Sequence, residues 1–95
     1  MNLPLNTNLT GKVAVITGAA GTLCSVFSRA LAASGAKVAL LDITVDRVQA
    51  LADKLGLGSD RAFCAAVDVS NEESVKATVD AIVKHFGRID VLVNA

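Results

Sequence analysis

Four short apolar segments recur along the chain at a nearly regular interval, and this recurrence constrains the fold more than any other feature. They begin 25, 24 and 28 residues apart, and each is too short for a core helix. Their aliphatic composition without polar alternation is typical of parallel strands that are buried on both faces. The predicted strands are residues 12–16 (KVAVI), 37–41 (KVALL), 61–67 (RAFCAAV) and 89–93 (IDVLV).

Each gap between the predicted strands contains an amphipathic helical pattern, with apolar residues at spacings of three and four. Ser70 and Glu73 form an S-x-x-E pair that predicts a capping box, and Gly87 is placed for a left-handed residue at the helix end. Gly35 and Gly56 are candidates to end the other two helices. The apolar stripes comprise Leu23, Val26, Phe27, Ala30 and Leu31; Val45, Val48, Leu51, Ala52 and Leu55; and Val75, Val79, Ile82 and Phe86.

Strands that alternate with helices predict a doubly wound parallel α/β sheet with right-handed crossovers. No Gly/Ser linker or low-complexity tract divides the 95 residues, so we expect a single domain preceded by an N-terminal tail at residues 1–10. In such sheets a ligand binds beyond the carboxyl ends of the strands. The residues that follow each predicted strand are therefore the candidate site.

The first strand is followed by TGAAGT, with Gly18 and Gly21 just before a helix. A pyrophosphate at this position would meet free backbone N–H groups and the positive end of the helix dipole. An ordinary tight strand-to-helix turn has the same glycines. This loop alone leaves both interpretations open.

The second strand ends at Asp42, which lies 24 residues after Gly18. An acidic residue near this offset accepts hydrogen bonds from ribose hydroxyls and repels a 2′-phosphate. Residues 43–45, beginning with Ile43, contain no cation that could neutralise such a phosphate, so NAD is favoured over NADP. The alternative is that Asp42 caps the next helix, a role for which Thr44 is an equally good candidate.

The third and fourth predicted strands are followed by further short polar groups. Asp68 could accept a hydrogen bond from the exocyclic amine of an adenine, and Val69 could pack against its ring. Asn94 and Ala95 are small enough to let a cofactor approach the backbone. Each pair taken alone is also ordinary turn chemistry.

Charge and cysteine content exclude several functional classes. Nine basic and nine acidic residues leave no electrostatic footprint for nucleic acid or an anionic membrane surface. No apolar run approaches the roughly 18 residues of a membrane span, so we expect a soluble protein. Cys24 and Cys64 lack metal-site spacing, and no secretory signal is recognisable, so we expect free thiols, no metal and a cytoplasmic location.

With all four strand ends in view, the chain resembles the N-terminal half of a short-chain dehydrogenase/reductase, from LTGKVAVITG onward. TGAAGTLC stands at the place of the family's T-G-x-x-x-G-x-G, LLD at that of its acidic residue that selects NAD, DVS at that of its adenine contact, and VNA at the start of its N-N-A-G segment. The resemblance implies a partial Rossmann fold. The implied cofactor-binding residues are Gly18, Ala20, Gly21, Thr22, Leu23, Asp42, Ile43, Asp68, Val69, Asn94 and Ala95.

The resemblance also implies NAD(P)-dependent hydride transfer between a carbonyl and an alcohol, with a catalytic Tyr, Lys and Ser, and a homo-oligomer for the complete family protein. The 95 residues contain no tyrosine, so we assign no catalytic residue to them. One alternative is a truncated Rossmann module that binds a nucleotide or a partner without chemistry. A methyltransferase-type fold shares the glycine turn but does not predict DVS and VNA.

The glycine loop departs from the family pattern at two positions. Thr22 and Cys24 stand where the family has its second and third glycines. The Thr22 hydroxyl could contact a phosphate or cap the helix, or its Cβ could push the pyrophosphate outward. For Cys24 we favour packing between helix and strand over a redox role, although helix N-termini lower thiol pKa values.

Overall fold

The computed structural model describes residues 9–19 and 21–93, without the side chains of Thr22 and Leu23. In these residues four parallel strands form one sheet, in the order β3-β2-β1-β4, and three helices connect them. The predicted doubly wound α/β architecture is confirmed. The elements are β1 (Val13–Thr17), α1 (Thr22–Ala33), β2 (Lys37–Asp42), α2 (Val45–Leu55), β3 (Ala62–Ala66), α3 (Glu72–Phe86) and β4 (Val91–Val93).

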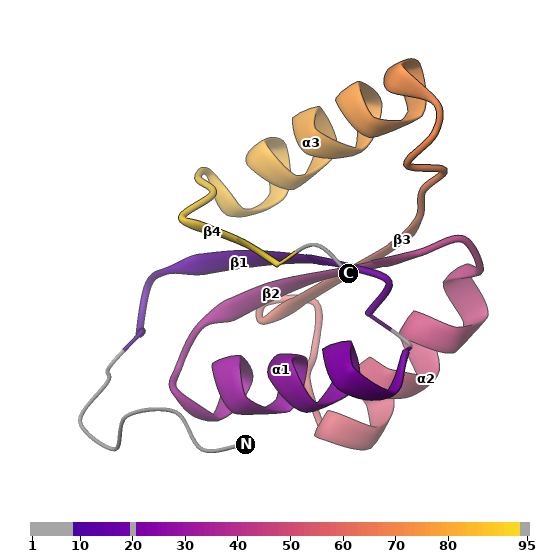
Figure 1. Cartoon of the computed structure of the whole chain (residues 1–95). Coiled ribbons are helices and arrows are strands. Elements are labelled where there is room, and N and C mark those ends of the chain that lie inside the picture. Colours follow the sequence, from indigo (N-terminus) through magenta and orange to yellow (C-terminus); the bar gives the residue numbers. More distant parts are fainter. Residues whose placement is uncertain (1–8, 20, 94–95) are drawn as a thin grey trace.

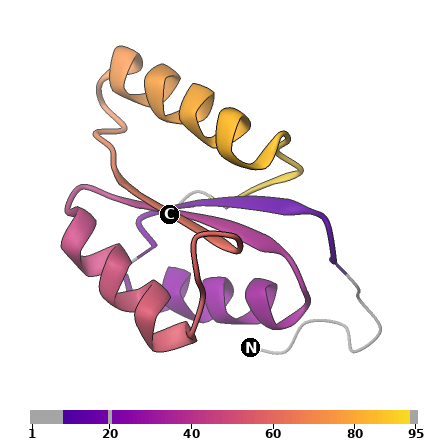
Figure 2. The same ribbon diagram turned by 180° about the vertical axis from the view of Figure 1, so that it is seen from behind.

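The helices lie in two layers on opposite faces of the sheet. Helices α1 and α2 cover one face and α3 covers the other (Figures 1 and 2). This division follows from right-handed crossovers, because the chain steps from β1 to β2 to β3 in one direction and then returns across the sheet to β4. The direction of winding therefore reverses between β1 and β4, which makes their carboxyl ends the switch point at which such sheets bind ligands.

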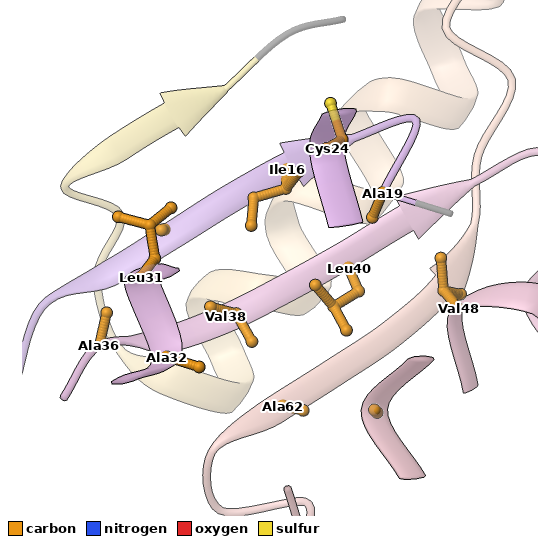
Figure 3. Packing of buried hydrophobic residues seen from close by; sticks show 12 residues of the cluster. Ile16, Ala19, Cys24, Leu31, Ala32, Ala36, Val38, Leu40, Val48 and Ala62 are labelled. Carbon is orange, nitrogen blue, oxygen red and sulfur yellow. The ribbon is translucent and has the colours of Figure 1, made fainter. Parts of the chain in front are cut away.

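The two central strands contribute side chains to both layers, as strand geometry requires. On the side of α1 and α2, Ile16 and Leu40 are fully buried with Cys24 of α1 (Figure 3). On the side of α3, Val15 and Leu41 pack in a second cluster. This confirms the prediction that β1 and β2 are buried on both faces, and it places Cys24 in the core.

The sheet edges are less buried than the apolar sequence predicts. Leu92 of β4 is 65% exposed, and most of β3 is only half-buried. Two apolar residues of the predicted helix stripes, Val45 and Val79, are also exposed rather than in the core. Val45 is the first residue of α2, and Val79 and Leu92 line an open hollow between α3 and the sheet, so a correct periodicity does not ensure burial.

The predicted glycine stops are observed at the ends of α2 and α3. Gly56 is the C-cap of α2 with φ of 70°, and Gly87 is the C-cap of α3 with φ of 85°. Both angles lie in the left-handed region that favours glycine. Helix α1 ends at Ala33 with Ser34 as its C-cap, and Gly35 follows with φ of 96°. The three stops keep each helix short enough to return the chain to the start of the next strand.

The predicted capping box at the start of α3 is wrong. The N-cap is Asn71, whose Oδ1 accepts a hydrogen bond of 3.2 Å from the Ser74 N–H. The Ser70 hydroxyl instead donates to Asp68 Oδ1 at 2.6 Å. Ser70 therefore belongs to the turn before the helix, because Asp68 offers it a charged acceptor.

Candidate functional site

The carboxyl ends of β1, β2 and β3 enclose a hollow of about 220 Å³. The parallel register aligns these ends, pairing Thr17 with Leu41 and Asp42 with Ala66. Residues from the first three strand ends identified in the sequence therefore meet at one place. The hollow is lined by Thr17, Gly18, Asp42, Ile43, Val67, Asp68 and Val69.

The loop after β1 is held in a tight, specific conformation. Gly18 has φ of 64°, which strongly favours glycine, and its carbonyl accepts the Gly21 N–H at 2.9 Å. The buried Ala19 ties the loop to the neighbouring strand by donating its N–H to Leu41 O at 2.9 Å. A Cβ on Gly21 would lie 3.2 Å from Gly18 O, so the turn leaves little room for a side chain there.

This loop leads, at the edge of the hollow, into a helix N-terminus whose N-cap residue is a glycine. Gly21 is the N-cap of α1 and forms no side-chain cap, and the first turn contains no acidic residue. The first helical bond runs from the Ser25 N–H to Gly21 O. The amides of residues 22–24 therefore have no partner within the helix, and with the helix dipole they can receive an anion. Ala20 lies outside the described residues.

Asp42 is half-buried where β2 ends, and its Oδ1 accepts a hydrogen bond of 2.7 Å from the Ile43 N–H. Thr44 is the N-cap of α2, without a side-chain capping bond. Ile43 is 72% exposed at the rim of the hollow. Asp42 thus places a carboxylate at the hollow, where it can accept hydrogen bonds from hydroxyl groups of a ligand.

Asp68 and Val69 form the opposite rim of the hollow. Asp68 Oδ1 accepts hydrogen bonds from the Ser70 hydroxyl at 2.6 Å and from the Ser70 N–H at 3.0 Å. These bonds, the hydroxyl's above all, hold the pKa of Asp68 below its usual value of 3.8 and keep the carboxylate charged. Val69 beside it is 64% exposed and offers an apolar surface.

The fourth strand end lies next to the first. Thr17 Oγ1 donates to Val93 O at 3.4 Å, and β4 pairs with β1 up to Ile16 and Val93. The two predicted site residues that follow, Asn94 and Ala95, lie outside the described residues. Val93, the last described residue, therefore lies at the switch point between β1 and β4.

Sequence reasoning missed Asp90, which attaches β4 to β1. Asp90 Oδ2 accepts the Val13 N–H at 2.9 Å, its own N–H donates to Val13 O at 2.9 Å, and Oδ1 pairs with Arg88 at 2.6 Å. Arg88, followed by the Val13 N–H, lowers the pKa of Asp90. This is why β4 begins at Val91 and not at the predicted residue 89. The available signal was a charged residue inside an apolar strand segment.

Arg61 was also missed, and it stabilises the other end of α1. Its Nη2 donates to Ala32 O at 2.7 Å and to Ala36 O at 2.9 Å. A cation at this position satisfies carbonyls at the end of α1 and interacts favourably with the negative end of the helix dipole. Helix α1 therefore has a cation at its C-terminal end and no anion of the protein in its first turn.

The described residues offer neither a metal site nor a membrane-spanning helix. Residues 9–19 and 21–93 contain no group of three His, Cys, Asp or Glu side chains that could hold a metal ion. No described helix has the length and apolar character needed to cross a membrane.

Residues 12–95 match a family model described as short chain dehydrogenase. The chain belongs to the short chain dehydrogenase family. This membership accounts for the sheet order and for the glycine loop at the first strand end. The chain spans about a third of the length of the curated relatives it matches, with 33% and 36% for the first two.

Individual relatives agree with the family assignment. D-threitol dehydrogenase of Mycolicibacterium smegmatis is 40% identical over 97 residues, covering 100% of this chain and 36% of that protein. A 3-ketoacyl-(acyl-carrier-protein) reductase of Brucella melitensis, crystallised with NADH, matches with a TM-score of 0.82 and 36% identity over 90% of this chain and 34% of its own. The N-domain of a bacterial malonyl-CoA reductase with NADP matches with a TM-score of 0.81 and 41% identity, covering 88% and 16%.

Proposed function

We propose that the protein is an NAD-dependent oxidoreductase that transfers hydride between an alcohol and a carbonyl, and that this chain supplies its cofactor-binding half. One observation carries the proposal: the hollow at the strand ends brings a half-buried carboxylate, Asp42, close to the loop that leads into a helix with a glycine N-cap and no acid in its first turn. A dinucleotide presents the complementary groups, since its pyrophosphate is anionic and its adenosine ribose carries hydroxyls.

Each part of the dinucleotide has a defined place in this proposal. The amides of Thr22 and Leu23, with Gly18, Ala20 and Gly21 in the loop, receive the pyrophosphate at the start of α1. Asp42 accepts hydrogen bonds from the ribose hydroxyls beside Ile43. These contacts would hold one end of the cofactor firmly through the backbone.

The adenine and the rest of the cofactor meet the two remaining strand ends. Asp68 accepts from the adenine amine, and Val69 packs its exposed side chain on the ring. Asn94 and Ala95, which lie outside the described residues, are small enough to let the cofactor approach the backbone. The bound cofactor supplies the hydride chemistry, while the residues of this chain bind and orient it.

The preference for NAD over NADP rests on the charge at the end of β2. A 2′-phosphate would lie against the Asp42 carboxylate, and none of residues 43–45 carries a positive charge. Structural neighbours hold both NADH and NADP, so family membership alone leaves the preference open. Asp42 is therefore the residue on which the proposal depends.

The proposal assigns no catalytic residue to these 95 residues, which contain no tyrosine. It includes a cytoplasmic location, consistent with the two unpaired cysteines, Cys24 and Cys64. It also includes a homo-oligomer for the complete protein, as the family resemblance implies.

The preference can be tested by titrating the protein with NADH and NADPH, following the fluorescence of the reduced nicotinamide. We expect tighter binding of NADH, and about a tenfold loss of NADH affinity in Asp42→Ala, because a hydrogen-bonded charged contact is worth about 1.5 kcal/mol or more. NADPH should gain affinity in the same variant. The exposed Asp80→Asn on α3 is the matched control for loss of one carboxylate. Tighter binding of NADPH by the unmodified protein would refute the role of Asp42.

A further inference from the structure

A second hollow, of about 380 Å³, lies between α1 and α2 and is lined by cationic side chains. The two helices lie side by side on the same face of the sheet (Figures 1 and 2). No residue of this hollow belongs to the hollow at the strand ends. We call it the basic hollow, and it is lined by Ser25, Arg29, Arg47, Ala50, Leu51 and Lys54.

The charges of the two helices are segregated around this hollow. On α2, Arg47 and Lys54 are seven residues apart and therefore share a face, which Leu51 also occupies. Asp46 and Asp53 share a different face about a quarter-turn away and do not line the hollow. The lining of the basic hollow thus contains three cations and no acid.

The cations of the basic hollow have no anionic partner in the described part of the chain. Arg29 is the one charged residue of α1, and it forms no ion pair there. The same is true of Arg47 and Lys54, while the nearby Asp53 accepts a hydrogen bond from Gln49 instead. The formal net charge of the whole chain is zero, so this cluster is a local concentration of charge and not a consequence of a basic protein.

We propose that the basic hollow is a second binding site, which takes a small molecule carrying two or more phosphate groups. The forked guanidinium groups of Arg29 and Arg47 are suited to bidentate contacts with phosphate oxygens, and Lys54 adds a point charge. Ala50 and Leu51 provide an apolar floor. A hollow of this size fits a compact polyphosphate or bisphosphate and leaves the dinucleotide hollow free.

The test is a calorimetric titration of the complete protein with tripolyphosphate at 0.15 M NaCl, an ionic strength that screens weak surface attraction. The titration is run with saturating NADH, so that the cofactor loop is occupied, and again without it, so that the result stands independently of the proposed dinucleotide site. We expect one site for tripolyphosphate in the presence of NADH. Binding that disappears when NADH is present would refute the second site.

Paired variants distinguish the basic hollow from general charge effects. We expect Arg29→Gln with Arg47→Gln to weaken tripolyphosphate binding roughly tenfold or more, because two charge-assisted contacts are lost. Lys76→Gln on α3, on the opposite face of the sheet, should leave binding unchanged. The affinity for NADH should be the same in all variants.

Two further outcomes would overturn the proposal. One is an equal loss of affinity in Lys76→Gln, which would indicate non-specific attraction of anions. The other is tighter binding of a hexaglutamate peptide than of tripolyphosphate, which would indicate a site for acidic protein segments. Because Arg29 and Arg47 are exposed, the variants should fold, and circular dichroism checks this before titration.

Discussion

Helices α1 and α3 begin in opposite ways, although both follow a parallel strand and a short turn. The first turn of α3 is completed by the protein itself, with Asn71 as a side-chain cap and Glu72 and Glu73 as acidic residues. The first turn of α1 follows a glycine N-cap, which has no side chain to cap the helix, and it contains no acidic residue. The chain thus satisfies one helix N-terminus and leaves the other available to an external anion.

The contrast shows why a helix N-terminus becomes a binding site only in context. The positive end of the dipole is present in both helices, but Asn71 and the two glutamates already neutralise it in α3. In α1 no acidic residue of the first turn neutralises the positive end of the dipole, which lies beside the hollow that contains Asp42 and Asp68. The difference lies in two or three residues and not in the backbone of the helices.

We expect the largest effect when the start of α1 receives a capping carboxylate, so that it resembles the acidic start of α3. In Gly21→Asp the new carboxylate can cap the helix, which should offset the crowding of its Cβ against Gly18 O, so we expect little change in the free energy of unfolding, while the pyrophosphate is repelled. We expect the dissociation constant for NADH to rise about tenfold or more. Fluorescence titration measures the affinity and urea unfolding measures the stability.

The matched control is Gly21→Asn, which adds nearly the same volume and a capping group without the charge. Like the aspartate, the asparagine would place its Cβ 3.2 Å from Gly18 O. If the asparagine variant loses as much NADH affinity as the aspartate variant, then steric crowding of the loop, and not charge, explains the effect.

The converse change removes the cap from α3. Asn71→Ala deletes the hydrogen bond that Oδ1 accepts from the Ser74 N–H, and we expect about 1 kcal/mol less free energy of unfolding. NADH affinity should be unchanged, because in the proposed complex the N-terminus of α3 does not bind the pyrophosphate. Asn71→Asp retains a capping acceptor and should restore most of the stability in urea unfolding. A loss of NADH affinity in Asn71→Ala would show that the two helix starts are not independent.

A smaller effect concerns the turn before α3 and depends on pH. The Ser70 bonds lower the pKa of Asp68 in the folded protein, so their stabilisation is fully present above the unfolded value of 3.8 and is lost as pH falls through the folded value. In Ser70→Ala the pKa of Asp68 should rise toward its usual value, and the loss of stability in acid should become shallower. Carbon-13 NMR of the carboxyl group follows the titration. An unchanged Asp68 pKa in this variant would contradict the assigned cause.

Much of the fold was predictable from short-range patterns in the sequence. Strand spacing and composition predicted the parallel α/β sheet, and Gly56 and Gly87 were correctly identified as helix ends because only glycine adopts a left-handed φ without strain. The capping box was wrong, since the motif does not reveal that Asp68 competes for the Ser70 hydroxyl. Capping depends on which acceptor is nearest in space.

The sequence predicted which residues at the strand ends form the candidate site, but not how these residues are arranged in space. Gly18, Asp42 and Asp68 each follow a predicted strand, and the structure brings all three to one hollow. Asp90 was not predicted, because its role depends on the Val13 N–H of a strand 77 residues away. The basic hollow was missed as well, since Arg29 and Arg47 lie on different helices and only packing brings them together.

The sequence by itself determined the alternation of strands and helices, the left-handed stops and the lack of an acid at the start of α1, because these depend on local backbone preference and on residue type. Only the tertiary structure decided which strand ends meet, which helix N-terminus remains open beside Asp42, and which cations share a hollow. Those features depend on sheet order and on the right-handed return of the chain from β3 to β4, which places distant residues side by side.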